Sequence, residues 1–229
     1  MTAVISTNKV CRYFGDEGET MVKAVDRVSI EIERGEFTAI VGPSGSGKTT
    51  LLHLIGGLDN PTSGSVELSG TNIAEMSGAV LSDFRRDNIG FIFQSYNLIP
   101  VFSAEENIEY IMLLQGVAPA ERKRRVAEML EQVGLEGLGD RRPNKLSGGQ
   151  QQRVAIARAM VSHPEIILAD EPTANLDSRT GIALLDLMKE LNEKHKMTFV
   201  FSTHDEKIMK RAGRLIHMQD GEIESDERK

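Results

Sequence analysis

The sequence contains no tryptophan and a single cysteine, and aromatic residues make up 5% of it. Because Cys11 stands alone, no disulfide can form within the chain, which favours a reducing compartment over a disulfide-rich secreted fold. No apolar run approaches the roughly 18 residues that a membrane helix needs; the densest stretches are Phe37–Val41 and Ile108–Leu114. The first residues lack a basic start followed by an apolar core, so the sequence predicts no signal peptide.

An excess of basic charge is also missing. The 27 lysines and arginines are outnumbered by 34 aspartates and glutamates, for a formal net charge of −7. The chain therefore lacks the basic footprint of a nucleic-acid-binding protein. Its 229 residues, 40% of them hydrophobic, suit one large domain or one domain with a subdomain. The composition predicts an acidic, cytosolic, globular protein that does not bind nucleic acid.

Apolar patterning predicts a β-rich first third, a helical middle from about Ser103 to Gly134, and an alternation of helices and strands after it. We expect strands at Val28–Glu33, Phe37–Val41, Gly64–Ser69, Ile89–Phe93, Ile166–Ala169, Thr198–Ser202, Leu215–Met218 and Glu222–Glu224. We expect helices from Lys48 to Gly56 and at Pro119–Val133, Gly148–Ser162, Ser178–His195 and Asp205–Arg211, with a frayed polar tail at Ser225–Lys229. Buried strands that alternate with helices predict an α/β domain with a parallel sheet.

A complete G-x-x-x-x-G-K-[ST] string occupies Gly42–Thr49, directly after the apolar run Phe37–Val41 and directly before a helical pattern. Its glycines let the backbone wrap closely, so that N–H groups point at phosphate oxygens. The helix start adds the positive end of its dipole. In this motif Lys48 reaches the β- and γ-phosphates and the Thr49 hydroxyl binds Mg²⁺. The string therefore predicts a nucleoside triphosphate site.

Two acids, Asp170 and Glu171, follow the apolar run Ile166–Ala169. Alternation along a strand predicts that Asp170 faces the metal while Glu171 lies beyond it, near the γ-phosphate. A carboxylate in that place is the natural general base for an attacking water. An ordinary acidic turn after a core strand is the alternative. A phosphate loop with paired acids also fits kinases, GTPases and helicases.

The string Leu146–Gln150, Leu-Ser-Gly-Gly-Gln, separates these classes. Physically it is a helix start, because Ser147 is a good N-cap and Gln150 completes a capping box three residues later. Its free N–H groups suit an anion, yet one nucleotide site needs no second anion-binding helix start so far along the chain. The string resembles the signature motif of ABC-type ATPases. In that family it serves the ATP of the partner subunit in a head-to-tail dimer, which implies two composite sites.

The resemblance extends from about Val10 to Glu224 and implies roles for further residues. Gln94 resembles the glutamine that senses Mg²⁺ and leads into the helical subdomain, and His204 resembles the histidine that contacts the γ-phosphate. Tyr13 resembles the aromatic that stacks on adenine, with an ordinary strand aromatic as the alternative. Asn175–Asp177 resembles the loop that communicates across the dimer.

Motif and resemblance together imply three sets of site residues. The catalytic set is Glu171, His204 and Gln94, and the Mg²⁺ set is Thr49, Gln94 and Asp170. The residues expected to bind ATP are Tyr13, Gly42, Pro43, Ser44, Gly45, Ser46, Gly47, Lys48, Thr49, Thr50, Ser147, Gly149 and Gln150.

Within the family, the chain is most similar to the ATPase subunits of macrolide-exporter and lipoprotein-releasing systems (MacB/LolD-like). The shared features are the long Gly15–Lys23 excursion and the strings Gly56–Gly64, Gly90–Pro100 and Asp170–Asp177. Lipoprotein releasers tend to carry Glu where this chain has Gln150. Macrolide, peptide and lipoprotein cargo therefore remain open.

Two surface segments carry competing interpretations. Tyr96–Phe102 is apolar and follows Gln94, so it is either a core loop or a groove for a short helix of a membrane subunit. Glu121–Arg125 is a basic cluster, and its helical spacing from Glu128 and Glu131 favours a solvated helix face over contact with membrane head groups.

These observations predict an α/β fold: a P-loop NTPase (RecA-like) core with a parallel sheet, an N-terminal antiparallel β subdomain and an inserted α-helical subdomain. We expect one ABC-type ATPase domain over residues 1–229, with the core near 1–93 and 160–229 and the helical subdomain near 94–159. The expected function is ATP hydrolysis that closes and reopens a homodimer and powers a separate transmembrane permease, at the cytoplasmic face of the inner membrane. An ABC-type ATPase without a transport role is the alternative; a nucleotide kinase would not need Leu146–Gln150.

Overall fold

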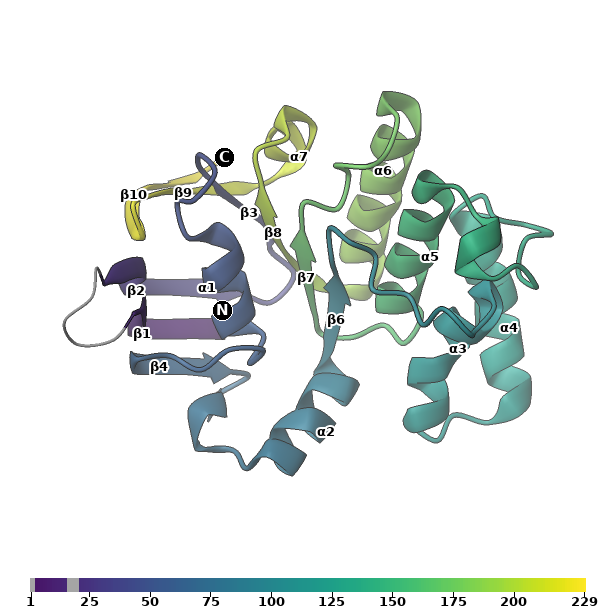
Figure 1. Cartoon of the computed structure of the whole chain (residues 1–229), viewed down its shortest axis with the longest axis horizontal. Coiled ribbons are helices and arrows are strands. Elements are labelled where there is room, and N and C mark those ends of the chain that lie inside the picture. The colour runs from purple at the N-terminus through teal and green to yellow at the C-terminus, as the bar shows by residue number, and fades with distance from the viewer. Residues whose placement is uncertain (1–2, 16–20) are drawn as a thin grey trace.

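The computed structural model describes residues 3–15 and 21–229, which form two β-sheets and a set of helices (Figure 1). The strands are β1 (Ala3–Phe14), β2 (Val22–Glu33), β3 (Phe37–Val41), β4 (Ser63–Leu68), β5 (Thr71–Asn72), β6 (Ile89–Ile92), β7 (Ile166–Asp170), β8 (Thr198–Thr203), β9 (Arg214–Gln219) and β10 (Glu222–Arg228). The α-helices are α1 (Lys48–Ile55), α2 (Gly78–Asn88), α3 (Ala104–Leu114), α4 (Pro119–Gln132), α5 (Gly148–Met160), α6 (Ser178–His195) and α7 (Glu206–Arg211).

The larger sheet has the strand order β10-β9-β3-β8-β7-β6. Its strands from β9 to β6 pair in parallel, and β10 pairs antiparallel with β9. Every residue of β3 and β8 is buried, which explains why both read as continuous apolar runs. Parallel strands end at the same edge of a sheet, so the segments after β3, β7 and β8 meet there. That edge carries the site.

The smaller sheet is antiparallel, with the order β2-β1-β4-β5. Helix α1 contacts strands of both sheets and buries Leu51, Leu52, Leu54 and Ile55 between them. Figure 1 shows α1 beside the strands of the small sheet and in front of β8. The helix that starts at the phosphate loop is therefore fixed by apolar packing on two sides.

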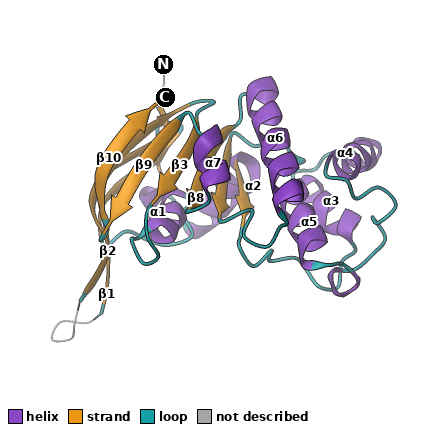
Figure 2. Cartoon of the chain, turned by 90° about the horizontal axis from the view of Figure 1, so that it is seen from above, coloured by secondary structure: helices purple, strands orange, loops and turns teal. Residues whose placement is uncertain are grey.

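The helices α3, α4, α5 and α6 gather at the opposite end of the molecule from the small sheet (Figure 2). Their buried side chains form one cluster with Ala39 and Val41 of β3, whereas Ile40 faces the cluster around α1. The expected capping box of Ser147 with Gln150 starts α5, and a second capping box, Ser103 with Glu106, starts α3. The expected α/β architecture with a parallel sheet, an antiparallel sheet and a helical segment is confirmed.

The sequence expectation gives no range for strands β1 and β5 or for helix α2, and two further strands extend several residues beyond their expected bounds. Helix α2 has no fully buried residue, and its apolar stripe is short, with Leu81 and Phe84 packed partly buried against the cluster around α1. Strand β2 begins at Val22 rather than Val28, and β10 runs to Arg228 where a frayed tail is expected. The Gly15–Lys23 excursion falls largely on residues 16–20, outside the described residues. In the part of the chain that is described, no helix is both long and apolar enough to cross a membrane.

Candidate functional site

The phosphate loop joins β3 to α1 and is held in shape by its own lysine. The Lys48 ammonium donates hydrogen bonds to the carbonyl oxygens of Gly42 at 2.8 Å and Pro43 at 2.7 Å. Gly47 has φ +98°, and a Cβ there would lie 2.1 Å from the carbonyl oxygen of Ala24 on β2. Only glycine therefore allows the loop to lie directly against β2. The result is a rigid cradle with a cation at its base.

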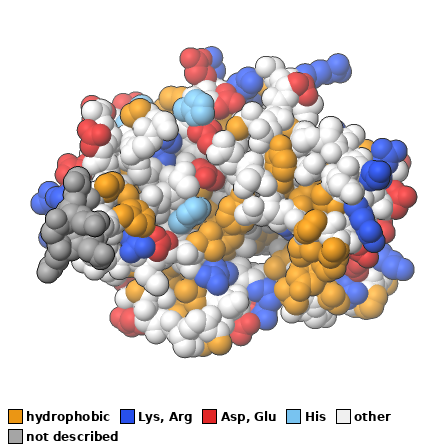
Figure 3. All heavy atoms as spheres, in the orientation of Figure 1, with side chains coloured by type: hydrophobic (Ala, Val, Ile, Leu, Met, Phe, Trp, Pro, Cys, Tyr) orange, Lys and Arg blue, Asp and Glu red, His pale blue; other side chains and the backbone are white. Residues whose placement is uncertain are grey.

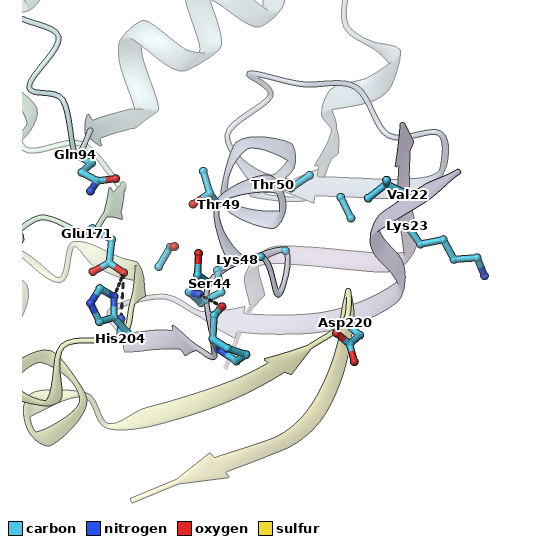
Figure 4. A pocket seen from close by; sticks show the side chains of 15 residues that line it. Val22, Lys23, Ser44, Lys48, Thr49, Thr50, Gln94, Glu171, His204 and Asp220 are labelled. Carbon is cyan, nitrogen blue, oxygen red and sulfur yellow. Dashed lines mark hydrogen bonds and ion pairs between the residues drawn. The ribbon is translucent and has the colours of Figure 1, made fainter. Parts of the chain in front are cut away.

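This loop forms the middle of a pocket of about 760 Å³ (Figure 4). Of the expected binding residues, seven line it: Pro43, Ser44, Gly45, Gly47, Lys48, Thr49 and Thr50. Gly42 and Ser46 belong to the loop but are not among the lining residues of the pocket. Among the described residues, the buried hydroxyl of Ser46 has no hydrogen-bond partner.

The two acids stand at the end of β7, beside the phosphate loop. The Thr49 hydroxyl donates to Asp170 Oδ1 at 2.9 Å, which joins two of the three residues expected to bind Mg²⁺. Glu171 follows with φ +44°, a left-handed conformation that non-glycine residues adopt rarely. This turn directs its carboxylate into the pocket, as Figure 4 shows.

Glu171 is fixed by two residues from the end of β8. The Thr203 hydroxyl donates to Glu171 Oε2 at 2.9 Å, while His204 Nδ1 lies 2.5 Å from Oε1. The side chain of Glu171 is 14% exposed and that of His204 is 78% exposed, so the histidine lies between the carboxylate and solvent. The parallel register of β7 and β8, which pairs Asp170 with Ser202, brings these groups together.

Gln94 lines the same pocket, after β6. Its main-chain oxygen accepts a hydrogen bond from Asn175 Nδ2 at 3.0 Å, so two loops expected to act on the nucleotide are directly linked. Asp177, in the second of these loops, caps α6 by accepting from the N–H groups of Arg179 and Thr180. Hydrogen bonding to Thr180 lowers the pKa of Asp177, consistent with a capping carboxylate that stays charged.

The signature string lies outside the pocket lining. Among the described residues that line the pocket, none is Ser147, Gly149 or Gln150. Gln150 and Ser147 exchange capping-box bonds of 2.9 and 3.3 Å, which leaves other N–H groups of this helix start available. A Cβ at Gly148 would lie 2.9 Å from the Tyr96 hydroxyl, so the string packs against the loop after Gln94.

Tyr13 does not line the pocket either. It lies opposite Lys23 in the β1–β2 pairing, and Lys23 is a pocket residue. Sequence reasoning missed Val22, Lys23, Ala24, Ser202 and Asp220, which complete the lining. These five follow no motif. They reach the pocket because strand pairing places them there, so only the fold reveals them.

The loop Tyr96–Phe102 is held by hydrogen bonds to a buried side chain. Asn107 accepts from the Ile99 N–H at 2.8 Å and donates to the carbonyls of Ile99 and Phe102. Leu98 packs against the larger core cluster. Leu98 and Ile99 are both half-buried, which favours the core-loop alternative for these two residues, whereas Val101 of the same segment is 65% exposed.

An arginine from α5 holds the start of the same loop. Tyr96 and Asn97 are both left-handed, with φ +62° and +48°. Arg158 donates to their carbonyl oxygens at 3.0 and 2.7 Å, and burial lowers the pKa of its guanidinium. Two successive left-handed residues are strained, so this contact stabilises a conformation that the loop would otherwise leave.

Comparisons with known proteins agree with this geometry. The family model described as ABC transporter matches residues 25–174. An uncharacterized ABC transporter ATP-binding protein of Thermotoga maritima is 50% identical over 214 residues, which cover 93% of this chain and 91% of that protein. The macrolide export ATP-binding/permease protein MacB of Hyphomonas neptunium is 48% identical over 223 residues, or 97% of this chain and 34% of MacB. This chain thus spans about a third of that relative's length.

A solved structure gives the same result in three dimensions. The dimeric, post-hydrolysis structure of the ATP-binding cassette MJ0796 bound to ADP and Pi matches with a TM-score of 0.93 at 42% identity, covering 98% of both chains. The shared fold, the sequence identity and the complete set of motifs agree. The chain belongs to the ATP-binding cassette family of ABC transporter ATPases.

Proposed function

We propose that this chain is the ATP-hydrolysing subunit of a membrane transporter and that it works as a homodimer with a separate permease. The observation that carries the proposal is the Glu171 carboxylate, fixed by Thr203 and His204 in the same pocket as Lys48. A general base and a phosphate-binding cation that face one cavity are what hydrolysis of a phosphoanhydride requires.

The pocket residues divide the chemistry between them. The loop N–H groups and Lys48 bind the β- and γ-phosphates and offset their charge. Glu171 accepts the proton of the attacking water, and His204, beside its carboxylate, contacts the γ-phosphate. Because Thr203 and His204 fix the Glu171 carboxylate before reaction, little reorganisation is needed when the water is activated.

The residues near the loop fit Mg²⁺. This ion prefers oxygen ligands and usually takes one or two carboxylates together with substrate phosphates. The Thr49 hydroxyl and the Asp170 carboxylate, 2.9 Å apart, supply such oxygens, and the Gln94 side chain lines the same pocket. When bound, Mg²⁺ would neutralise charge on the phosphates and orient them.

The position of the signature string supports a homodimer. Its helix start is suited to a phosphate but lies outside the lining of its own chain's pocket. In a two-fold dimer, Ser147, Gly149 and Gln150 of each chain would complete the other chain's site. The matching MJ0796 structure is dimeric, which supports this arrangement.

An exposed apolar group on and beside α3 supports a membrane partner. Val101, Tyr110, Leu113 and Leu114, here called the α3 apolar surface, are 65%, 37%, 50% and 49% exposed. Figure 3 shows hydrophobic side chains gathered over α3. Such a surface on a charged protein marks an interaction site, and it continues from the loop that begins at Gln94. A helix of the permease would bind here and place the chain at the cytoplasmic face of the membrane.

The test uses purified protein and four variants. Lys48→Ala should reduce ATP hydrolysis at least about a hundredfold, as loss of a charge-stabilising donor does, while Lys123→Ala on exposed α4 should not. Glu171→Gln should bind ATP and form a stable dimer in size-exclusion chromatography. Adding Ser147→Arg should abolish that dimer. Wild-type turnover in Lys48→Ala would refute the nucleotide site, and a dimer that persists with Ser147→Arg would refute the composite site.

A further inference from the structure

The lining residues define two ends of the pocket. Gln94, Glu171 and His204 stand at one end, the phosphate loop lies in the middle, and Val22 and Lys23 of β2 stand at the other end (Figure 4). Because Glu171 must lie near the terminal phosphate, the base of a bound nucleotide points toward β2.

At the β2 end, the buried carboxylate of Asp26 contacts Tyr13, Lys23 and Arg27, whose Nε lies 3.4 Å from Oδ1. Asp26 Oδ1 accepts a 2.6 Å hydrogen bond from the Tyr13 hydroxyl, and its Oδ2 accepts a 2.9 Å bond from Lys23 Nζ. The Lys23 ammonium in turn lies 5.5 Å from the centre of the Tyr13 ring. The Asp26 side chain is 5% exposed, although β2 stands at the rim of the pocket. Bonds from Tyr13 and Lys23 lower the Asp26 pKa to about 2, so the carboxylate is charged.

The main chain of Asp26 is tied to the phosphate loop. Its N–H donates to the Gly221 carbonyl at 2.8 Å, and the Gly221 N–H donates to the Ser46 carbonyl at 3.1 Å. Ala24, two residues before Asp26, touches Gly47. Asp26 therefore connects two fixed points: the cradle that holds the phosphates, and the ring and ammonium at the base end.

We infer that Asp26 is the positioning residue of the base-binding end of the pocket, where it holds Lys23, which lines the pocket, and the Tyr13 ring beside the Lys23 ammonium at a fixed distance from the phosphate loop. The inference rests on the proposed nucleotide site and adds to it the residue that orients the base. Asp26 acts through Tyr13 and Lys23 and touches no phosphate. Its loss should weaken binding of ligands that carry a base and leave phosphate binding unchanged.

The test compares ATP with inorganic tripolyphosphate, which has the phosphates but no base. Binding is measured by calorimetry on the whole purified chain. Asp26→Asn should weaken ATP binding roughly three- to tenfold, the worth of one lost hydrogen bond, with tripolyphosphate binding unchanged. In hydrolysis the KM for ATP should rise by a similar factor while kcat stays within about twofold. The matched control is Asp59→Asn, which breaks the 2.8 Å ion pair with Arg12, next to Tyr13 on β1.

A double-mutant cycle tests whether Asp26 acts through the tyrosine. Tyr13→Phe keeps the ring and removes the hydroxyl, so Asp26→Asn should cost less affinity in that background than in the wild type. Additive effects, an unchanged ATP affinity, equal losses for ATP and tripolyphosphate, or an equal loss in Asp59→Asn would each overturn the inference. Because calorimetry does not depend on turnover, a wild type that binds ATP without hydrolysing it would refute the proposed function alone.

Discussion

Asn107 fastens the loop that leads from Gln94 to α3, and its removal gives a quantitative test of that role. Its side chain is fully buried and bonds to Ile99 in both directions, through the N–H at 2.8 Å and the carbonyl at 3.1 Å. It also donates to the carbonyls of Phe102 and Ser103. We consider Asn107→Ala, which deletes all of these bonds and adds no new group.

The cost follows from the groups left without partners. A buried main-chain donor or acceptor that loses its hydrogen bond costs about 1–3 kcal/mol. Counting only the N–H and carbonyl of Ile99, and near the lower value because water can reach this loop, Asn107→Ala should destabilise the fold by about 2–3 kcal/mol. For a domain of this size, each kcal/mol lowers the melting temperature by about 2–4 °C. The expected decrease is therefore about 4–12 °C.

Thermal melting and hydrogen exchange together measure this effect. The exposed Asn144, changed to Ala, is the matched control and should melt as the wild type does. The amides of residues 99–102 should exchange faster in Asn107→Ala, because the bonds that hold them are lost. A melting temperature within about 2 °C of the wild type, or a large decrease without faster exchange at 99–102, would show that Asn107 does not anchor the loop.

Two further predictions concern the helical end of the molecule. Leu113→Ser combined with Leu114→Ser should leave the melting temperature nearly unchanged, because both side chains are about half exposed, but should abolish co-purification with a membrane partner. Leu98→Ser should instead lower the melting temperature. The opposite pattern would favour the interpretation that Leu98 lines a binding groove. The rings of His163 and His195 stack at 4.1 Å, and burial, together with nearby positive charges, lowers both pKa values from 6.5. Since the unfolded chain binds these protons more tightly, the stability that these histidines contribute should be complete above pH 6.5 and should fall as the pH drops through the lowered pKa values. This loss of stability in acid should be smaller after both histidines are changed to Gln. An equal loss in that variant would assign the effect to other groups.

Much of the fold could be predicted from local signals. The helix at Lys48–Ile55 begins and ends as its glycines indicate, and β3 has the bounds of its apolar run. Helix α2 was missed because its apolar stripe is short: Leu81 and Phe84 pack against the core, and neither is fully buried. The C-terminal strand was expected at Glu222–Glu224, but the charges after it concealed its continuation to Arg228. Those charges hold it in place, since Arg214 donates to Asp226 at 2.7 and 2.6 Å.

The site residues likewise fall into those that the sequence alone predicts and those that only the fold reveals. Lys48, Asp170 and Glu171 follow motifs that a sequence displays, so their roles could be inferred one by one. The contact between Glu171 and His204 depends on the register of two strands and spans 33 residues, so no local pattern contains it. Asp26 likewise acts through contacts that exist only once β1 and β2 pair. Motifs indicate which chemistry is present, whereas pairing decides what holds each group in place.

The location of the signature string outside its own pocket has a consequence for how ATP consumption is controlled. In the proposed dimer, each cassette lacks part of its catalytic site until a second cassette supplies it. At low concentration, hydrolysis by free cassettes should then rise with the square of their concentration. When two cassettes are bound to one permease assembly, the assembly sets the effective concentration of each cassette near the other. For short connections this effective concentration reaches about the millimolar range. Cassettes without a permease would therefore spend little ATP, and assembly itself would limit hydrolysis to places where transport can occur.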